Sequence, residues 1–356
     1  MLYSLRRRHL QLEPWQRTLA VMFVAQVCTA IGFSIIFPFL PLYIEDLGTN
    51  TGLSIEFWAG MVFSAQAVTM MIASPIWGSL ADRYGRKLMV QRAMYGGSVI
   101  ILLMAFARSA EELVFLRAIQ GMITGTVAAA NALVAAQAPR KHTGFAMGML
   151  QVGLWGGVSL GPLLGGILAD NFGFRLPFLV TAALLLISGL LVTFFAHEEF
   201  TPEQKAAGRD KRFREEWVHV VTMPGVGQTY MIRFLSGLTR SMIVPITPLF
   251  IMALILSGGL DARPPMPESG FFLDIMLPGE EGISTYTGLV VGIASATATL
   301  SAVYLGRLGD RIGHRSVLIG SALLAIIFYF PQALVTAPWQ LLVLQAITGL
   351  AMGGMV

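Results

Sequence analysis

The chain has 356 residues, of which 55% are hydrophobic and only 12% are charged, and its formal net charge is +4. Soluble domains carry about twice that share of charged residues, so the composition excludes a soluble globular protein. The single cysteine, Cys28, excludes an intramolecular disulfide framework.

Uncharged windows of membrane-spanning length follow one another along the chain. A bilayer's hydrocarbon core requires about 20 apolar residues per helix. Nine windows reach this length, one of them interrupted only by Arg92 near its end, and the last divides at Pro338, because proline ends a preceding helix. The sequence therefore predicts an all-α, polytopic membrane protein with ten spans, which contain the windows 18–44, 57–81, 88–107, 118–139, 143–169, 176–196, 241–260 and 282–306, and two within 316–356, and which extend to charged residues flanking the windows.

Basic residues lie mainly on one side of these spans. If the N-terminus is cytoplasmic, 18 of the 24 lysines and arginines fall in inner loops, and only Arg108, Arg175 and Arg263 fall in outer loops. The positive-inside rule therefore predicts a cytoplasmic N-terminus. The excess positive charge then faces anionic lipid, so no nucleic-acid partner is needed to explain it.

A loop pattern occurs twice, after the second and the eighth predicted spans. The copies are Gly78-Ser-Leu-Ala-Asp82-Arg83-Tyr-Gly85-Arg86-Lys87 and Gly306-Arg-Leu-Gly-Asp310-Arg311-Ile-Gly313-His314-Arg315. The glycines permit a tight turn and close helix approach, the aspartate suits cations or helix N-termini, and the basic residues suit lipid headgroups. The simpler explanation of this pattern is that any short inner loop can be basic. The presence of a second copy argues against it.

The two copies lie 228 residues apart, and Arg117-Ala-Ile-Gln-Gly121 aligns with Gln345-Ala-Ile-Thr-Gly349 at the same offset. A parallel repeat of two helical halves is typical of transporters with a mid-membrane substrate site. We predict an N-terminal six-helix half at 1–197, a cytoplasmic linker at 198–224 and an incomplete C-terminal half at 225–356. By the offset, Val356 corresponds to Ala128, so we expect the chain to stop inside its tenth helix, two helices short of twelve.

Arg117 falls inside a predicted span, one helical turn before Gly121. An arginine in hydrocarbon costs about 3 kcal/mol on insertion scales, so a retained one usually faces the bundle interior. The alternative is that Arg117 snorkels, because it lies only about one or two turns from the outer end of its helix.

The span at 143–169 carries glycine at every fourth residue, with a proline after the third glycine. This spacing bares one helix face for a partner helix, although generic packing is the alternative explanation. The residues of the pattern are Gly153, Gly157, Gly161, Pro162, Gly165 and Gly166.

Arg233 and Arg240 lie seven residues apart on about the same face of the seventh span, and Arg240 is too deep to snorkel comfortably. We hypothesise that these arginines line a cavity with Gln26 and Asn131, which favours an anionic, phosphate-bearing or neutral solute. The alternative is that they pair with backbone carbonyls or with the eleventh helix.

No G-x-x-x-x-G-K-[ST], H-E-x-x-H or G-x-S-x-G motif occurs, so neither ATP hydrolysis nor a recognised enzymatic site is predicted. We expect no enzyme activity, no cofactor and no metal, and the energy for transport must come from a gradient.

All acids lie in loops or at helix ends. If the gradient is one of protons, the titratable carrier lies in the two absent helices or among Glu45, Asp46 and Glu56 at the outer mouth.

The loop motif, the Arg117–Gly121 pattern and the glycine pattern together resemble the major facilitator superfamily. Within it they resemble the twelve-helix drug/proton antiporters of the bacterial multidrug-resistance and tetracycline-exporter kind. The resemblance covers essentially the whole chain and implies two pseudo-symmetric helical halves, a monomer and a bacterial inner membrane. It also implies that the loop motif is a latch for the outward-facing state, that Arg117 and Gly121 act in proton transfer, and that 153–166 is the antiporter signature.

The resemblance predicts proton-coupled efflux of drug-like small molecules by alternating access, and hence antibiotic resistance. The small-molecule substrate, the proton and the lipid bilayer are the expected partners. Two alternatives stay open: an importer or symporter of a small metabolite or organic anion, and a non-transporting receptor or inactive fragment.

Overall fold

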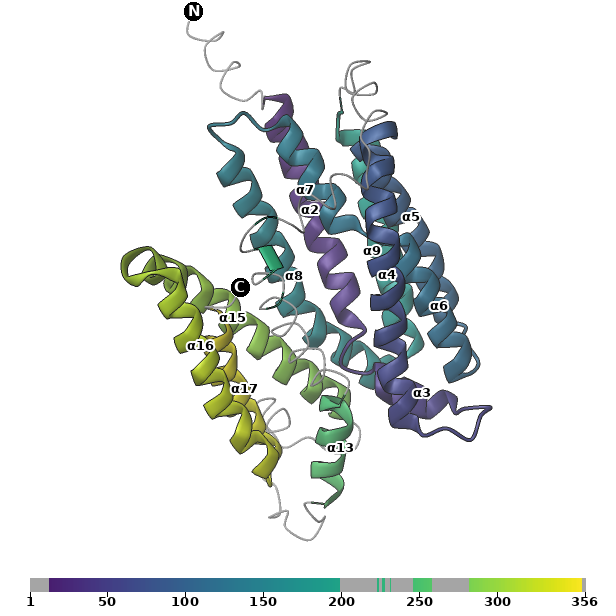
Figure 1. Ribbon diagram of the computed structural model, residues 1–356. Helices are drawn as coiled ribbons and strands as arrows, with labels where there is room; N and C mark the ends of the chain where they lie inside the picture. The colour runs from purple at the N-terminus through teal and green to yellow at the C-terminus, as the bar shows by residue number, and fades with distance from the viewer. Residues whose placement is uncertain are drawn as a thin grey trace, which may run out of the picture.

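The computed structural model describes residues 13–198, 223, 226–227, 231, 246–257 and 282–353. Within these ranges every regular element is a helix (Figure 1). Seven helical segments there are long and apolar enough to cross a membrane. The helices are α2 (Pro14–Ile35), α3 (Leu40–Leu47), α4 (Ile55–Tyr84), α5 (Arg86–Met104), α6 (Ala110–Ile123), α7 (Thr126–Gln137), α8 (Thr143–Phe172), α9 (Arg175–Phe195), α13 (Thr247–Ser257), α15 (Ile283–Ile312), α16 (His314–Tyr329), the 3-10 helix η3 (Phe330–Leu334) and α17 (Pro338–Met352).

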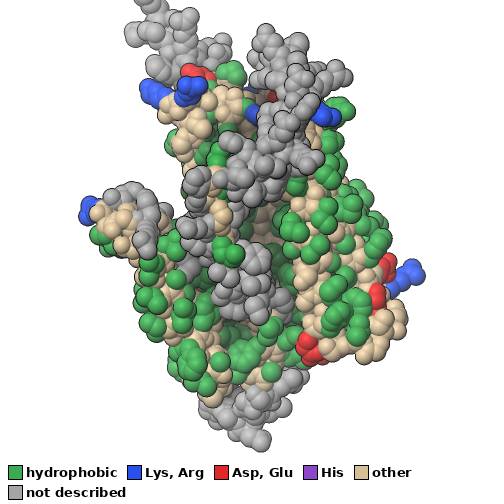
Figure 2. Space-filling view, viewed as in Figure 1, with side chains coloured by type: hydrophobic (Ala, Val, Ile, Leu, Met, Phe, Trp, Pro, Cys, Tyr) green, Lys and Arg blue, Asp and Glu red, His purple; other side chains and the backbone are tan. Residues whose placement is uncertain are grey.

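Charged side chains gather at the two ends of the bundle, and apolar side chains cover the face between them (Figure 2). We call one end the basic end, where the turns after α4 and α7 lie at the top of Figure 1 and the turn after α15 lies lower, at the left, and the other the acidic end, where α3 and the turn before α6 lie. The helices therefore present the apolar belt that a bilayer requires.

Two predicted spans differ from the observed helices. The first span is divided into α2 and α3 by a turn before Pro41, and α2 begins at Pro14, because proline suits the first helical turn. The fourth span runs from Ala110 to Gln137 and is broken after Thr124, where Gly125 has φ +138°. This positive φ favours glycine and separates α6 from α7.

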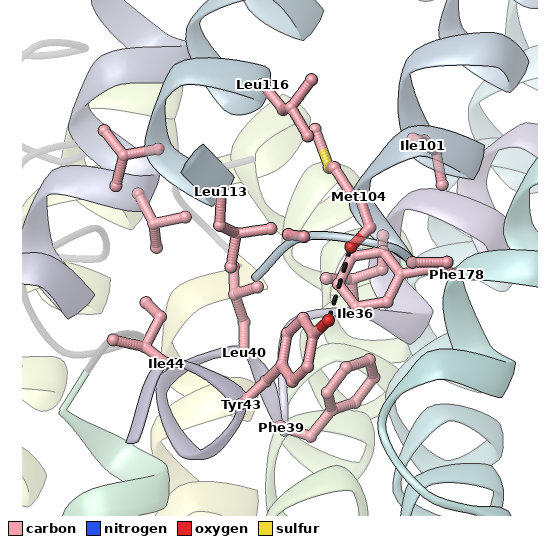
Figure 3. Packing of buried hydrophobic residues seen from close by; sticks show 14 of the residues in the cluster. Ile36, Phe39, Leu40, Tyr43, Ile44, Ile101, Met104, Leu113, Leu116 and Phe178 are labelled. Carbon is pink, nitrogen blue, oxygen red and sulfur yellow. Dashed lines mark hydrogen bonds between the residues drawn. The ribbon is translucent and has the colours of Figure 1, made fainter. Parts of the chain in front are cut away.

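Aromatic packing fixes the turn between α2 and α3 near the acidic end (Figure 3). The ring of Phe39 meets that of Phe178 edge-on, with 5.7 Å between their centroids. The Tyr43 hydroxyl donates a hydrogen bond to the Met104 carbonyl at 3.5 Å. A further buried cluster joins Leu42 of α3 to α13, α15 and α17, so the early and late helices of the chain meet at this end.

The predicted repeat is present in the helices. Ile283 begins α15 and Ile55 begins α4, 228 residues apart, and both helices are 30 residues long. Pro338 begins α17 at the same offset from Ala110 of α6. The offset therefore relates whole helices and not only the loop motif.

Candidate transport site

The first loop motif forms a tight corner between α4 and α5 at the basic end. Gly85 lies in this corner with φ +104°, a conformation that favours glycine. The carboxylate of Glu198, which follows α9, accepts hydrogen bonds from the backbone nitrogens of Arg86 (2.8 Å) and Lys87 (2.7 Å). Glu198 therefore caps the first turn of α5, where negative charge is favoured.

Two basic side chains of the motif bind backbone carbonyls of other helices. The Lys87 ammonium donates to the carbonyls of Thr193 (2.9 Å) and Ala196 (2.7 Å) at the end of α9. The Arg86 guanidinium donates to the Ala132 carbonyl of α7 at 3.2 Å. These two half-buried cations were expected to anchor to lipid headgroups, and in this structure they bind helix carbonyls.

The other positions of the first copy are more open. Asp82 is half-buried, with its carboxylate 3.9 Å from the Arg86 guanidinium, and Arg83 is exposed. If Gly78 carried a side-chain carbon, no described residue would lie within 4 Å of that carbon. The contacts of the motif with α7 and α9 described above are made by Arg86 and Lys87.

The second copy repeats the corner between α15 and α16. Gly313 has φ +91°, and Arg311 is exposed. The surroundings of Gly306 and the side chains of Asp310 and Arg315 lie outside what the structure describes.

Arg117 of α6 is enclosed and exposes only 1% of its surface. Its Nη1 donates to the Oε1 atoms of Gln66 on α4 and of Gln120 one turn along α6, both at 3.0 Å. The Nε and Nη2 atoms of Arg117 and the Nε2 atom of Gln120 are buried without a hydrogen-bond partner. The snorkelling alternative is therefore wrong, since Arg117 faces the interior of the bundle.

Gly121 brings α6 directly against α4. A side-chain carbon at this position would collide with the Thr69 hydroxyl and the Gln66 carbonyl. The helix carrying Arg117 is thus held close to the helix that supplies its partner, Gln66.

The glycine pattern of α8 forms two contact faces, and the helix continues through Pro162. The first face packs on α2. A side-chain carbon added at Gly157 would lie 2.9 Å from the Val27 carbonyl oxygen, and one added at Gly161 would lie 2.7 Å from the Ile31 carbonyl oxygen. The Ser34 hydroxyl of α2 also contacts the Gly157 carbonyl at 3.2 Å. Gly165 likewise lies against the backbone of Ile35, whereas Gly153 lies against the side chains of Phe23 and Val27.

The second face of α8 packs on α15 near the acidic end. Gly166 lies against the backbone of Ser284 and Thr285, and Gly288 of α15 lies against the Pro162 carbonyl. Closer to the middle of the helices, an added carbon at Gly292 would be 2.9 Å from the carbonyl of Ser159. Helix α8 therefore lies between α2 and α15 and contacts the backbone of both.

The profile of the Major Facilitator Superfamily matches residues 22–273 and 229–356. The chain belongs to the Major Facilitator Superfamily. It is accordingly a multi-pass membrane transporter of small molecules and not an enzyme, as its motifs predicted.

Curated relatives and solved structures agree with this membership. The facilitator chain is 36% identical over 341 residues to proteins named Multidrug resistance protein MdtG from Citrobacter koseri and Salmonella dublin, covering 96% of this chain and 78% of each relative. It matches a nucleoside transporter NupG variant with a TM-score of 0.70 at 13% identity, covering 94% of this chain and 80% of that one. A bacterial homolog of the human lysosomal transporter Spinster matches with a TM-score of 0.64 at 19% identity, covering 97% and 74%. These solved structures confirm the facilitator fold.

The expected cavity residues of this facilitator are only partly described. Gln26 of α2 exposes 1% of its surface, and its Oε1 atom has no hydrogen-bond partner. Asn131 is half-buried on α7, which packs against α2. Arg233 and Arg240 lie outside the described residues.

Three functional contacts escaped the sequence reasoning. Gln66 and Gln120 bind Arg117, and only Gln120 had a local signal, one turn after the arginine on the same helix face. Glu198 caps α5 from 111 or more residues away, which no local pattern indicates. Arg92, near one end of the predicted span 88–107, lies over the Trp77 ring at 3.4 Å from its centroid, a cation–π contact.

Proposed function

We propose that the chain is a proton-coupled exporter of drug-like small molecules that works by alternating access. The observation that carries this proposal is the unequal contact between α8 and α15. Their backbones touch from Gly166 to Ser159, whereas Val152, two turns nearer the basic end on the same face of α8, exposes 60% of its surface. A bundle closed at one end and parted at the other is one of the two states that alternating access requires.

The nature of the solute is supported by the curated relatives. Proteins named for multidrug resistance are 36% identical to this chain over 96% of its length. The two-faced glycine pattern of α8, which resembles the antiporter signature, supports export over import. We therefore propose antibiotics and similar compounds as the cargo.

The charge distribution supports the orientation. The loops at the basic end carry most of the lysines and arginines, so we propose that this end faces the cytoplasm of a bacterial inner membrane and that the N-terminus is cytoplasmic. The conformation with α8 and α15 joined at the acidic end is then the inward-facing state. We further propose a monomer, with halves at 1–197 and 225–356 and a linker at 198–224.

Proton coupling is proposed through Arg117 and Gly121, supported by the unpartnered donor atoms of the buried arginine. Glu45, Asp46 and Glu56 are exposed on α3 and the start of α4 near the acidic end, and they are the proposed carriers within the described helices. The loop motif is proposed as the latch of the outward-facing state, a role that the resemblance of its residues to the family motif implies.

For the cavity, we propose that Arg240 acts with Arg233, Gln26 and Asn131 to select anionic or neutral solutes. Arg240→Ala should lower the efflux of an anionic compound at least about tenfold, since one lost charge-assisted contact is worth about 1.5–3 kcal/mol. Efflux of a cationic compound should not fall, because no attraction is lost. Equal efflux of the anion by both proteins would refute the proposed cavity.

The whole proposal is tested by drug susceptibility of an efflux-deficient bacterium expressing the gene for this chain. Anionic, neutral and cationic compounds are compared with and without a protonophore. Resistance that the protonophore abolishes supports proton-driven export. An expressed, folded protein that protects against none of the compounds would contradict it.

A further inference from the structure

Asp170 occupies an unfavourable position in its own helix. It lies in the last turn of α8, where the backbone carbonyls create a partial negative charge that disfavours a carboxylate. The carboxylate accepts hydrogen bonds from the backbone nitrogens of Ser284 (Oδ1, 3.2 Å) and Thr285 (Oδ2, 2.6 Å), in the first turn of α15. Its stabilising partner is therefore a helix that follows more than 100 residues later in the chain.

Among the described residues, this carboxylate is the cap of α15, since no local side chain there caps its first turn. Its N-cap residue is Gly282, and its first turn contains no acid. Its repeat counterpart α4 is capped locally by Ser54, which accepts a hydrogen bond from the Phe57 nitrogen, and carries Glu56 in its first turn. A local cap in one helix is thus replaced by Asp170 in the other.

The backbone contact beside Asp170 makes the cap conditional on closure. Gly166, one turn before Asp170, touches Ser284 and Thr285, and Gly288 touches Pro162. If α8 and α15 part at the acidic end, the carboxylate and both backbone N–H groups lose their partners together. The cap therefore contributes stability only to the closed arrangement.

We propose that Asp170 is a gating residue that holds the acidic end closed by capping α15 across the contact between α8 and α15. The inference depends on alternating access and not on the identity of the solute. Asp170→Asn removes the charge and places an amide N–H near one of the two backbone donors. We expect the ratio of molecules open at the acidic end to those closed there to rise about tenfold.

The test measures distances between spin labels on the purified chain without solute. Cys28 is the only cysteine, so Cys28→Ser provides a cysteine-free background. Exposed positions carry the labels: Asn50→Cys with Thr336→Cys at the acidic end, and Lys141→Cys with Ser316→Cys at the basic end. Asp170→Asn should lengthen the first distance and shorten the second, a paired change that local fraying does not produce.

Ser54→Ala is the matched control, because it removes the cap of α4 without touching the contact between α8 and α15. Its distance distributions should equal those of the parent. If Asp170→Asn does not fold, Gly166→Ala tests the same contact, since its added carbon meets the Ser284 carbonyl. A folded variant with unchanged distances, or an equal shift in Ser54→Ala, would overturn the proposal. Because no solute is present, this result is separate from any failure to export drugs.

Discussion

The pair α4 and α6 and the pair α15 and α17 show which part of the repeat is packing. Gly121 lies against the Thr69 hydroxyl and the Gln66 carbonyl, and Gly349 lies against the Thr297 hydroxyl and the Ala294 carbonyl. Each contact partner is displaced by the same 228 residues as the helices. The close approach of the two helices is therefore duplicated down to its contacting atoms.

The polar groups beside these glycines are not duplicated. Arg117 donates to Gln66 and Gln120 in the first pair, whereas Gln345, its counterpart, donates to Gln332 at 3.1 Å in the second. The second network is neutral, and the first contains a buried cation with two unpartnered nitrogens. The comparison indicates that packing is shared by both pairs while the charge is specific to the first.

The largest expected effect tests the shared packing. Gly121→Val and Gly349→Val should each destabilise the protein by about 3 kcal/mol, because the added methyl groups meet backbone that cannot move aside. Thermal unfolding in detergent measures both losses. Gly144→Val is the control, since no described residue lies within 4 Å of a carbon added there. A loss of stability in only one of the two variants would show that the duplicated contacts are not energetically equivalent.

The next effect tests the specific charge. Arg117→Gln gives the first pair the residue type that the second pair has at Gln345. Transport should fall about 100-fold if Arg117 acts in proton transfer, while the melting temperature should not fall, because a poorly satisfied buried charge is removed. Protonophore-sensitive efflux and thermal unfolding are measured on the same variant. A lower melting temperature with proportionate loss of transport would instead assign Arg117 a structural role.

The helices and the repeat were predictable from the sequence, because long uncharged windows and a constant offset are visible along the chain. The residues at which the helices begin and end were less predictable. Charge-free windows placed the fourth span at 118–139, but α6 begins at Ala110, where Ser109 caps it and Glu111 and Glu112 occupy the first turn. Acids are favourable there, so an absence of charge is a poor marker of a helix start.

Residues of the site were predictable only where a single residue or a local spacing is informative by itself. The cost of placing an arginine in hydrocarbon predicted that Arg117 faces inward, and the glycine spacing predicted a bare face on α8. The partners Gln66, Glu198 and Asp170 act through contacts far apart in the sequence, and Asp170 looked like an ordinary acid at a helix end. Their roles follow from which helix ends meet in space, which local patterns do not encode.

The smallest expected effect concerns the corner glycines, which also repeat. Gly85 and Gly313 share a positive φ, and in the first copy Glu198 fixes the corner by capping α5. Glu198→Gln should destabilise the protein by about 1–2 kcal/mol, because an amide accepts these two hydrogen bonds less well than a carboxylate. Thermal unfolding should show this loss, while Asp46→Asn, which neutralises an exposed carboxylate on α3, should change little. Equal melting temperatures for Glu198→Gln and the parent would mean that Lys87 and its carbonyl partners on α9 hold the corner without the cap.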